Sequence, residues 1–120
     1  MAKILIADDA LFVRKNMVRI LTSSGHELFE AGNGEQAIEV YKEQLPDLVI
    51  MNIVMPVLDG ISAVREIRKI NYEAKIIMCS AMGQQKKIAA AIQAGATDFI
   101  AKPYKDAQVL DAVNNILKLT

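Results

Sequence analysis

The sequence predicts an α/β protein in which five parallel strands form one doubly wound sheet with helices on both faces. Short apolar runs alternate with segments of helical periodicity five times along the 120 residues. Two of the runs, DLVIM and KIIMC, are apolar on both faces, as expected for strands covered by helices on two sides. Four of the runs also end in a reactive polar residue, which is typical of the carboxyl edge of such a sheet.

The strands are expected at residues 3–7, 27–31, 47–51, 75–79 and 97–101. Each run has about five residues and is bounded by turn-forming or charged residues, which favours a strand over a helix. Right-handed crossovers between parallel strands then give the strand order 2-1-3-4-5, the flavodoxin-like arrangement.

Five amphipathic helices are expected, because apolar residues after each strand repeat with a spacing of about 3.6 residues. The repeating positions are Val13, Met17, Ile20 and Leu21, then Ala37, Ile38 and Tyr41, then Ile61, Val64 and Ile67, then Ile88 and Ile92, and finally Val109, Leu110, Val113, Ile116 and Leu117. Asn33 with Gln36 resembles a capping box, and Asp106 is expected to cap the last helix. Gly25 and Gly95 are suited to helix C-termini.

Polar residues at four strand ends are expected to form one pocket. Asp8 and Asp9 follow the first strand and Asn52 follows the third, so these three side chains meet at the switch point of the strand order. Ser80 follows the fourth strand and Lys102 the fifth, at the same edge of the sheet. Carboxylates within about 4 Å repel by roughly 4 kcal/mol per pair at an effective dielectric constant of 20, so a hard cation such as Mg²⁺ or Mn²⁺ is expected among them.

Size, charge and cysteine content exclude several classes of protein. A chain of 120 residues fits a single domain, residues 1–120, and needs no disulfide or structural metal to bury a core. Lys and Arg number 14, as do Asp and Glu, so the formal net charge is zero and nucleic acid is not expected as a partner. Cys79 is alone inside an apolar run, which indicates a reducing compartment, the cytoplasm. No apolar stretch approaches the roughly 18 residues that span a bilayer, so no membrane partner is expected.

Motifs at the strand ends together resemble the receiver domain of two-component response regulators, in particular stand-alone receivers of the chemotaxis (CheY) type. The motifs are the pair Asp8–Asp9, the stretch MNIVMPVLDG around Asn52, Ser80 with Ala81 at the start of SAMGQQ, and Lys102–Pro103 followed by Tyr104. The resemblance covers the whole chain. It implies a donor kinase of the CheA-like sensor histidine type, and an output protein such as a motor-switch component that binds the face of helix four, strand five and helix five.

The resemblance also implies roles for single residues. Asp9 is expected to ligate Mg²⁺ directly and Asp8 through water, while Val54 contributes its backbone carbonyl and position 52 its side-chain oxygen. When a phosphoryl group is added at position 52, the Ser80 hydroxyl moves inward and Lys102 bonds the phosphoryl oxygens. Tyr104, the aromatic residue after Lys-Pro, is then expected to rotate and reshape the output face. A cis peptide bond before Pro103 is also expected.

Asn52 departs from the family at the residue that performs the chemistry, because the family has an aspartate there. A neutral amide is not an anionic nucleophile, and it removes one of the charges that hold the metal. We therefore predict weakened Mg²⁺ affinity, no phosphotransfer and no enzymatic activity. An engineered Asp-to-Asn block, a natural pseudo-receiver and an ambiguity of the deamidation type are three origins for Asn52. A single deliberate substitution is favoured, because the other pocket residues are all retained.

Three other functions were compared with this interpretation. A phosphatase of the haloacid dehalogenase type needs its two acids two residues apart and room for a cap, whereas Asp8 and Asp9 are adjacent. A nucleotide- or flavin-binding module needs a glycine-rich turn after the first strand, where this chain has ADDALF. A phosphorylation-independent adaptor that keeps the receiver fold for binding alone, a pseudo-receiver, is the alternative that stays open.

Overall fold

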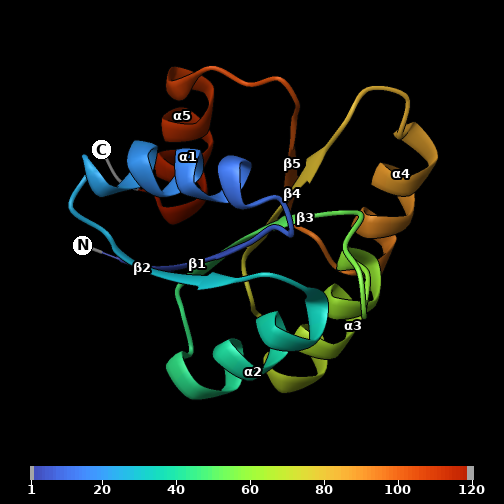
Figure 1. The fold of residues 1–120 in the computed structure, drawn as a ribbon. Helices are drawn as coiled ribbons and strands as arrows, with labels where there is room; N and C mark the ends of the chain where they lie inside the picture. Colours follow the sequence, from blue (N-terminus) through green and yellow to red (C-terminus); the bar gives the residue numbers. More distant parts are fainter. Residues whose placement is uncertain (1, 119–120) are drawn as a thin grey trace.

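The five strands form one parallel sheet in the order β2-β1-β3-β4-β5 (Figure 1). The computed structural model describes residues 2–118. The strands are β1 (Lys3–Ala7), β2 (Glu27–Ala31), β3 (Leu48–Asn52), β4 (Ile76–Ser80) and β5 (Asp98–Ala101). The predicted fold class and strand order are therefore confirmed. No helix within residues 2–118 is long and apolar enough to cross a membrane.

The strands β3, β4 and β5 begin one residue later than predicted, and β3 and β4 also end one residue later. The backbone N–H of Asp47 already bonds the Lys3 carbonyl at 2.8 Å, but the β1·β3 pairing starts at Leu48. At the other end, Asn52 pairs with Cys79 and Ser80 pairs with Ala101. Asn52 and Ser80 are thus the last residues of their strands, and the sheet holds their backbones in place.

Helices cover both faces of the sheet (Figure 1). They are α1 (Leu11–Thr22), α2 (Gly34–Gln44), α3 (Gly60–Ile70), α4 (Gln85–Ala94) and α5 (Asp106–Leu117). Along β1, Leu5 faces the core cluster beneath α2, α3 and α4, while Ile4 and Ile6 face the cluster beneath α1 and α5. Met51 and Met78 are fully buried in the first cluster, as expected of core residues.

The ends of the helices follow the predicted signals in part. The Asn33 side chain accepts a hydrogen bond from the Gln36 N–H at 2.8 Å, although the Gln36 side chain returns to the N–H of Gly32 rather than of Asn33. Gly95 forms the C-cap of α4. The prediction that Asp106 caps α5 is wrong: extended backbone continues through Lys105, which is the N-cap, and Asp106 is the first helical residue. Its carboxylate instead pairs with Arg19 at 3.2 Å.

Val57 in the β3–α3 loop has a left-handed backbone with φ of 69°. A β-branched residue is strained there by about 1–2 kcal/mol, whereas Asn tolerates this region. Since the Val57 side chain is 74% exposed, little buried area is lost on replacement. We expect Val57→Asn to raise the free energy of unfolding by about 1 kcal/mol, measured by urea denaturation. Val54→Asn, at an exposed valine outside the left-handed region, is the control, and an equal effect of both changes would contradict this explanation.

Candidate functional site

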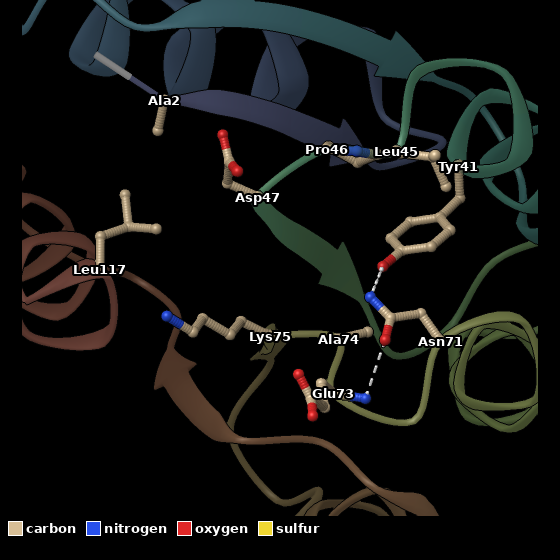
Figure 2. A pocket seen from close by; sticks show the side chains of 10 residues that line it. All are labelled: Ala2, Tyr41, Leu45, Pro46, Asp47, Asn71, Glu73, Ala74, Lys75 and Leu117. Carbon is tan, nitrogen blue, oxygen red and sulfur yellow. Dashed lines mark hydrogen bonds between the residues drawn. The ribbon is translucent and has the colours of Figure 1, made fainter.

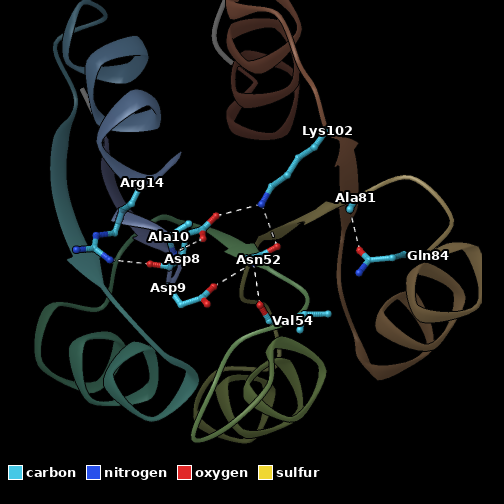
Figure 3. Close-up of polar contacts among 9 residues, drawn as sticks. All are labelled: Asp8, Asp9, Ala10, Arg14, Asn52, Val54, Ala81, Gln84 and Lys102. Atoms are coloured by element: carbon cyan, nitrogen blue, oxygen red, sulfur yellow. Dashed lines mark hydrogen bonds and ion pairs between the residues drawn. The ribbon is translucent and has the colours of Figure 1, made fainter. Parts of the chain in front are cut away.

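The carboxyl edge of the sheet brings together Asp8 and Asp9 after β1, Asn52 at the end of β3 and Lys102 after β5 (Figure 3). Asp8 follows β1, and its N–H bonds the Ala31 carbonyl of β2 at 3.0 Å. Lys102 follows β5, and its N–H bonds the Ser80 carbonyl at 2.7 Å. Together with Asn52 at the end of β3, these residues have backbones held by the sheet, so their side chains start from well-defined positions.

The Lys102 ammonium is the positive centre of the site. Its Nζ lies 3.2 Å from Asp8 Oδ2 and 3.2 Å from Asn52 Oδ1, and it donates to both (Figure 3). The other Asp8 oxygen accepts the Ala10 N–H at 2.9 Å. Because Asp8 is only 5% exposed, its charge depends on these partners rather than on water.

The Asn52 carboxamide lies between Lys102 and two further oxygen atoms. Its Nδ2 donates to the Val54 carbonyl at 2.8 Å and to Asp9 Oδ1 at 3.4 Å. Since both of those atoms are acceptors and the Lys102 ammonium is a donor, only this orientation of the amide satisfies all three neighbours. Asn52 is thus fully hydrogen-bonded within the chain.

Ser80 is placed differently from the other predicted site residues. Its side chain is 1% exposed, and its Oγ has no hydrogen-bond partner within the described part of the chain. The residue lines a hollow of about 370 Å³ between the β4–α4 loop and β5, which the large apolar side chains of Met82, Ile88 and Phe99 also line. A buried hydroxyl without a partner is costly, so a change that offers Ser80 a new acceptor would be favoured.

The aromatic residue on the Ser80 hollow is Phe99, not Tyr104. Tyr104 packs against the core cluster beneath α1 and α5 and lines a separate hollow with Phe12 and Val13. Burial raises the pKa of Tyr104 to about 12. The sequence-based reasoning missed Phe99, which is exposed on β5 next to the buried Ile100.

Arg14 on α1 is a second residue that the sequence-based reasoning missed. Its Nη1 donates to the Asp8 carbonyl at 2.7 Å, and its Nε donates to Glu30 Oε1 at 2.9 Å (Figure 3 shows Arg14 beside Asp8). Lys15 bonds the other Glu30 oxygen at 2.8 Å. Arg14 therefore ties α1 to the backbone of the site, and no local signal predicts its contact with Glu30, which is 16 positions away.

Glu30 should contribute to the acid sensitivity of the fold. Its hydrogen bond from Lys15, and to a smaller extent that from Arg14, lowers the pKa of Glu30 against the opposing effect of burial. The folded state therefore gains from ionised Glu30 above its unfolded pKa of about 4.3, and this gain is lost as the pH falls through the lower folded pKa. We expect Glu30→Gln to cost up to about 1 kcal/mol of unfolding free energy at pH 7 and less at pH 3, measured by urea denaturation. A difference that grew on acidification would contradict this.

The arrangement does not fit a divalent cation as it stands. Mg²⁺ is held by oxygen atoms, but the Asn52 group that faces the Val54 carbonyl and Asp9 is an NH₂ donor. Both oxygens already accept a hydrogen bond from it. Within residues 2–118, no group of three or more His, Cys, Asp or Glu side chains is placed to hold a metal.

Two other features take no part in this chemistry. Cys79 is buried, and burial raises its pKa to about 12, so it is an unreactive thiol. A hollow of about 460 Å³ that includes Tyr41, Asp47 and Asn71 is shown in Figure 2. There Asn71 donates to the Tyr41 hydroxyl at 3.2 Å and accepts the Glu73 N–H at 3.0 Å, so these groups satisfy one another.

Comparison with known proteins gives one consistent match. The family model for the response regulator receiver domain matches residues 4–114. Chemotaxis protein CheY of Bacillus subtilis is 55% identical over 116 residues, which cover 96% of this chain and 97% of that protein. Chemotaxis protein CheY of Thermotoga maritima is 50% identical over 117 residues, covering 97% and 98%. The crystal structure of a putative response regulator from Chloroflexus aurantiacus superposes with a TM-score of 0.93 at 30% identity, covering 98% of both chains.

Proposed function

The chain belongs to the response regulator receiver domain family and is CheY-like, and from this premise we propose that it relays the signal of a sensor histidine kinase to a motility output with its phosphoacceptor position blocked by Asn52. CheY-like receivers interact with histidine kinases and output proteins, and receiver domains are signalling domains rather than enzymes. We place it in the cytoplasm as one domain over residues 1–120, of which Met1, Leu119 and Thr120 lie outside the described residues.

The observation that carries this proposal is the position of Asn52 relative to Lys102. An oxygen that accepts from the Lys102 ammonium, beside Asp8 and Asp9, is where a nucleophilic carboxylate would attack phosphorus. In that reaction the P–N bond of a phosphohistidine breaks as a P–O bond to the carboxylate forms. Asn52 has no anionic oxygen, so the transfer cannot proceed. Receiver domains generally bind Mg²⁺ at the phosphorylation site, and we propose that this chain binds it weakly.

The proposed switch connects the site to an output surface on α4, β5 and α5. The unpartnered Ser80 hydroxyl supports it, because a phosphoryl oxygen nearby would supply the missing hydrogen bond. Phe99 is 45% exposed and lines the same hollow as Ser80. It is therefore the aromatic side chain that an inward movement of the Ser80 hydroxyl would affect first. The role expected of Tyr104 would then come second, through its packing beside Lys102.

A transfer experiment with a CheA-like kinase tests the proposal. The kinase is first labelled with radioactive phosphate on its histidine and then mixed with this chain or with Asn52→Asp in Mg²⁺. We expect the label to stay on the kinase when it is mixed with the Asn52 chain, and to move to the Asn52→Asp variant. Labelling of the Asn52 chain, or failure of the variant to take up label, would contradict the proposal.

A phosphorylation-independent adaptor is the second candidate function. The full set of hydrogen bonds to Asn52 favours it, since the amide needs no phosphoryl group or metal to be stable. This function predicts that an output protein binds the native chain and the phosphorylated Asn52→Asp variant with equal affinity, which isothermal titration calorimetry would measure. A relay predicts tighter binding of the phosphorylated variant.

A further inference from the structure

Two oxygen atoms of the site receive hydrogen bonds from a single NH₂ group. The Asn52 Nδ2 lies 2.8 Å from the Val54 carbonyl oxygen and 3.4 Å from Asp9 Oδ1. An amide NH₂ has two hydrogen atoms, so each oxygen has a donor of its own. The Asp9 carboxylate and the Val54 carbonyl are two of the groups that the family resemblance assigns to a metal ion.

We propose that the NH₂ group of Asn52 takes the place of the divalent cation between Asp9 and the Val54 carbonyl, so that the site keeps its geometry without a metal. The inference rests on the proposed function only for the choice of the metal ligands. It makes Asn52 a positioning residue of a metal-independent receiver, rather than only a residue that has lost its reactivity.

The charges at the site explain why an NH₂ group can replace a cation there. With Asn52, the ionised groups of the pocket are Asp8, Asp9 and Lys102, which leave one net negative charge. The Lys102–Asp8 pair is largely removed from water, whereas Asp9 is exposed, and solvent screens its charge. A carboxylate at position 52 would add a second net negative charge and replace the NH₂ donor with a repelling oxygen. That variant needs a cation, but the native chain does not.

Thermal unfolding in EDTA and in 10 mM Mg²⁺ tests the proposal without any phosphotransfer. We expect the midpoint of the Asn52 chain to differ far less between the two buffers than that of Asn52→Asp. Asn52→Asp should unfold at a lower temperature than the native chain in EDTA and recover in Mg²⁺. Asn52→Ala, which has neither the NH₂ group nor the added charge, should be less stable than the native chain in EDTA. Calorimetric titration should show Mg²⁺ binding to the native chain at least about tenfold weaker than to Asn52→Asp.

Nuclear magnetic resonance gives a direct view of the NH₂ group. In a ¹⁵N-labelled sample, both side-chain protons of Asn52 should exchange with water more slowly than those of Asn114, an exposed asparagine on α5. Addition of Mg²⁺ should leave the Asn52 signals in place.

Three results would overturn the proposal: Mg²⁺ affinity equal to that of Asn52→Asp, stability of Asn52→Ala equal to that of the native chain in EDTA, or unprotected Asn52 protons. A different result would contradict the proposed function: an Asn52→Asp variant that binds Mg²⁺ but takes up no phosphoryl group.

Discussion

The Asn52→Asp variant is expected to be modified to near completion by acetyl phosphate in Mg²⁺, whereas the chain with Asn52 is expected to form no acyl phosphate. The variant carboxylate would lie where Asn52 Oδ1 now lies, 3.2 Å from the Lys102 ammonium. An ionised oxygen at this point could attack phosphorus in line, and Lys102 would stabilise the charge on the transferring group; a Mg²⁺ ion held by the acids would supply further positive charge. Intact-protein mass spectrometry would record the added phosphoryl group, and its loss in hydroxylamine would identify it as an acyl phosphate.

Matched variants separate the nucleophile from its surroundings. In the Asn52→Asp background, Lys102→Met removes the ammonium that stabilises the transferring charge, and we expect the rate of phosphorylation to fall by about 10²–10³. Ser80→Ala should have a smaller effect, because the Ser80 hydroxyl has no hydrogen-bond partner among residues 2–118 that its loss would leave unpaired. The Asn52→Glu variant has the same charge as Asn52→Asp, but its carboxylate lies one methylene further from the backbone. We expect this variant to remain unphosphorylated. If Asn52→Asp took up no phosphoryl group while Lys102 and both acids were intact, the assignment of position 52 as the acceptor would be wrong.

Gly60→Ala is expected to destabilise the fold strongly and to distort the site together with it. A Cβ atom at Gly60 would lie 2.3 Å from the Asn52 carbonyl oxygen and 2.9 Å from the Ile53 carbonyl oxygen. Both atoms belong to the backbone, so neither a rotamer change nor a flexible tip can relieve the contact. Overpacking of this kind costs about 3 kcal/mol, and urea denaturation would measure the loss of unfolding free energy.

Gly32→Ala is the control for Gly60→Ala, because the nearest atoms to its added Cβ are the ends of the Gln36 and Arg14 side chains at 3.4 and 3.6 Å. These side chains can move, so the cost should stay below about 1 kcal/mol. In the Asn52→Asp background, Gly60→Ala should also slow phosphorylation, since the displaced carbonyl belongs to residue 52. Equal stabilities of the Gly60→Ala and Gly32→Ala variants would show that the backbone contact at Gly60 is not as tight as described.

The sheet could be predicted from short-range patterns. The apolar runs ILIA, DLVIM and KIIMC each fill one strand, and the helical repeats between them leave little choice but right-handed crossovers. Parallel strands place their carboxyl ends at one edge, so the grouping of Asp8, Asn52 and Lys102 followed from topology alone. The errors were local: strand boundaries shifted by one residue, and Asp106 lies inside α5 because extended backbone continues through Lys105.

The sequence by itself determined the fold class, the strand order and the types of side chain at the edge of the sheet, because these depend on periodicities of two and 3.6 residues and on strand ends. Only the tertiary structure decided how those side chains are partnered. The Asn52 NH₂ group faces Asp9, Arg14 reaches both Asp8 and Glu30, and Ser80 lies beside Phe99. Hydrogen-bond direction and side-chain contact depend on distances of a few ångströms between residues 6 to 43 positions apart, and no local pattern carries that information.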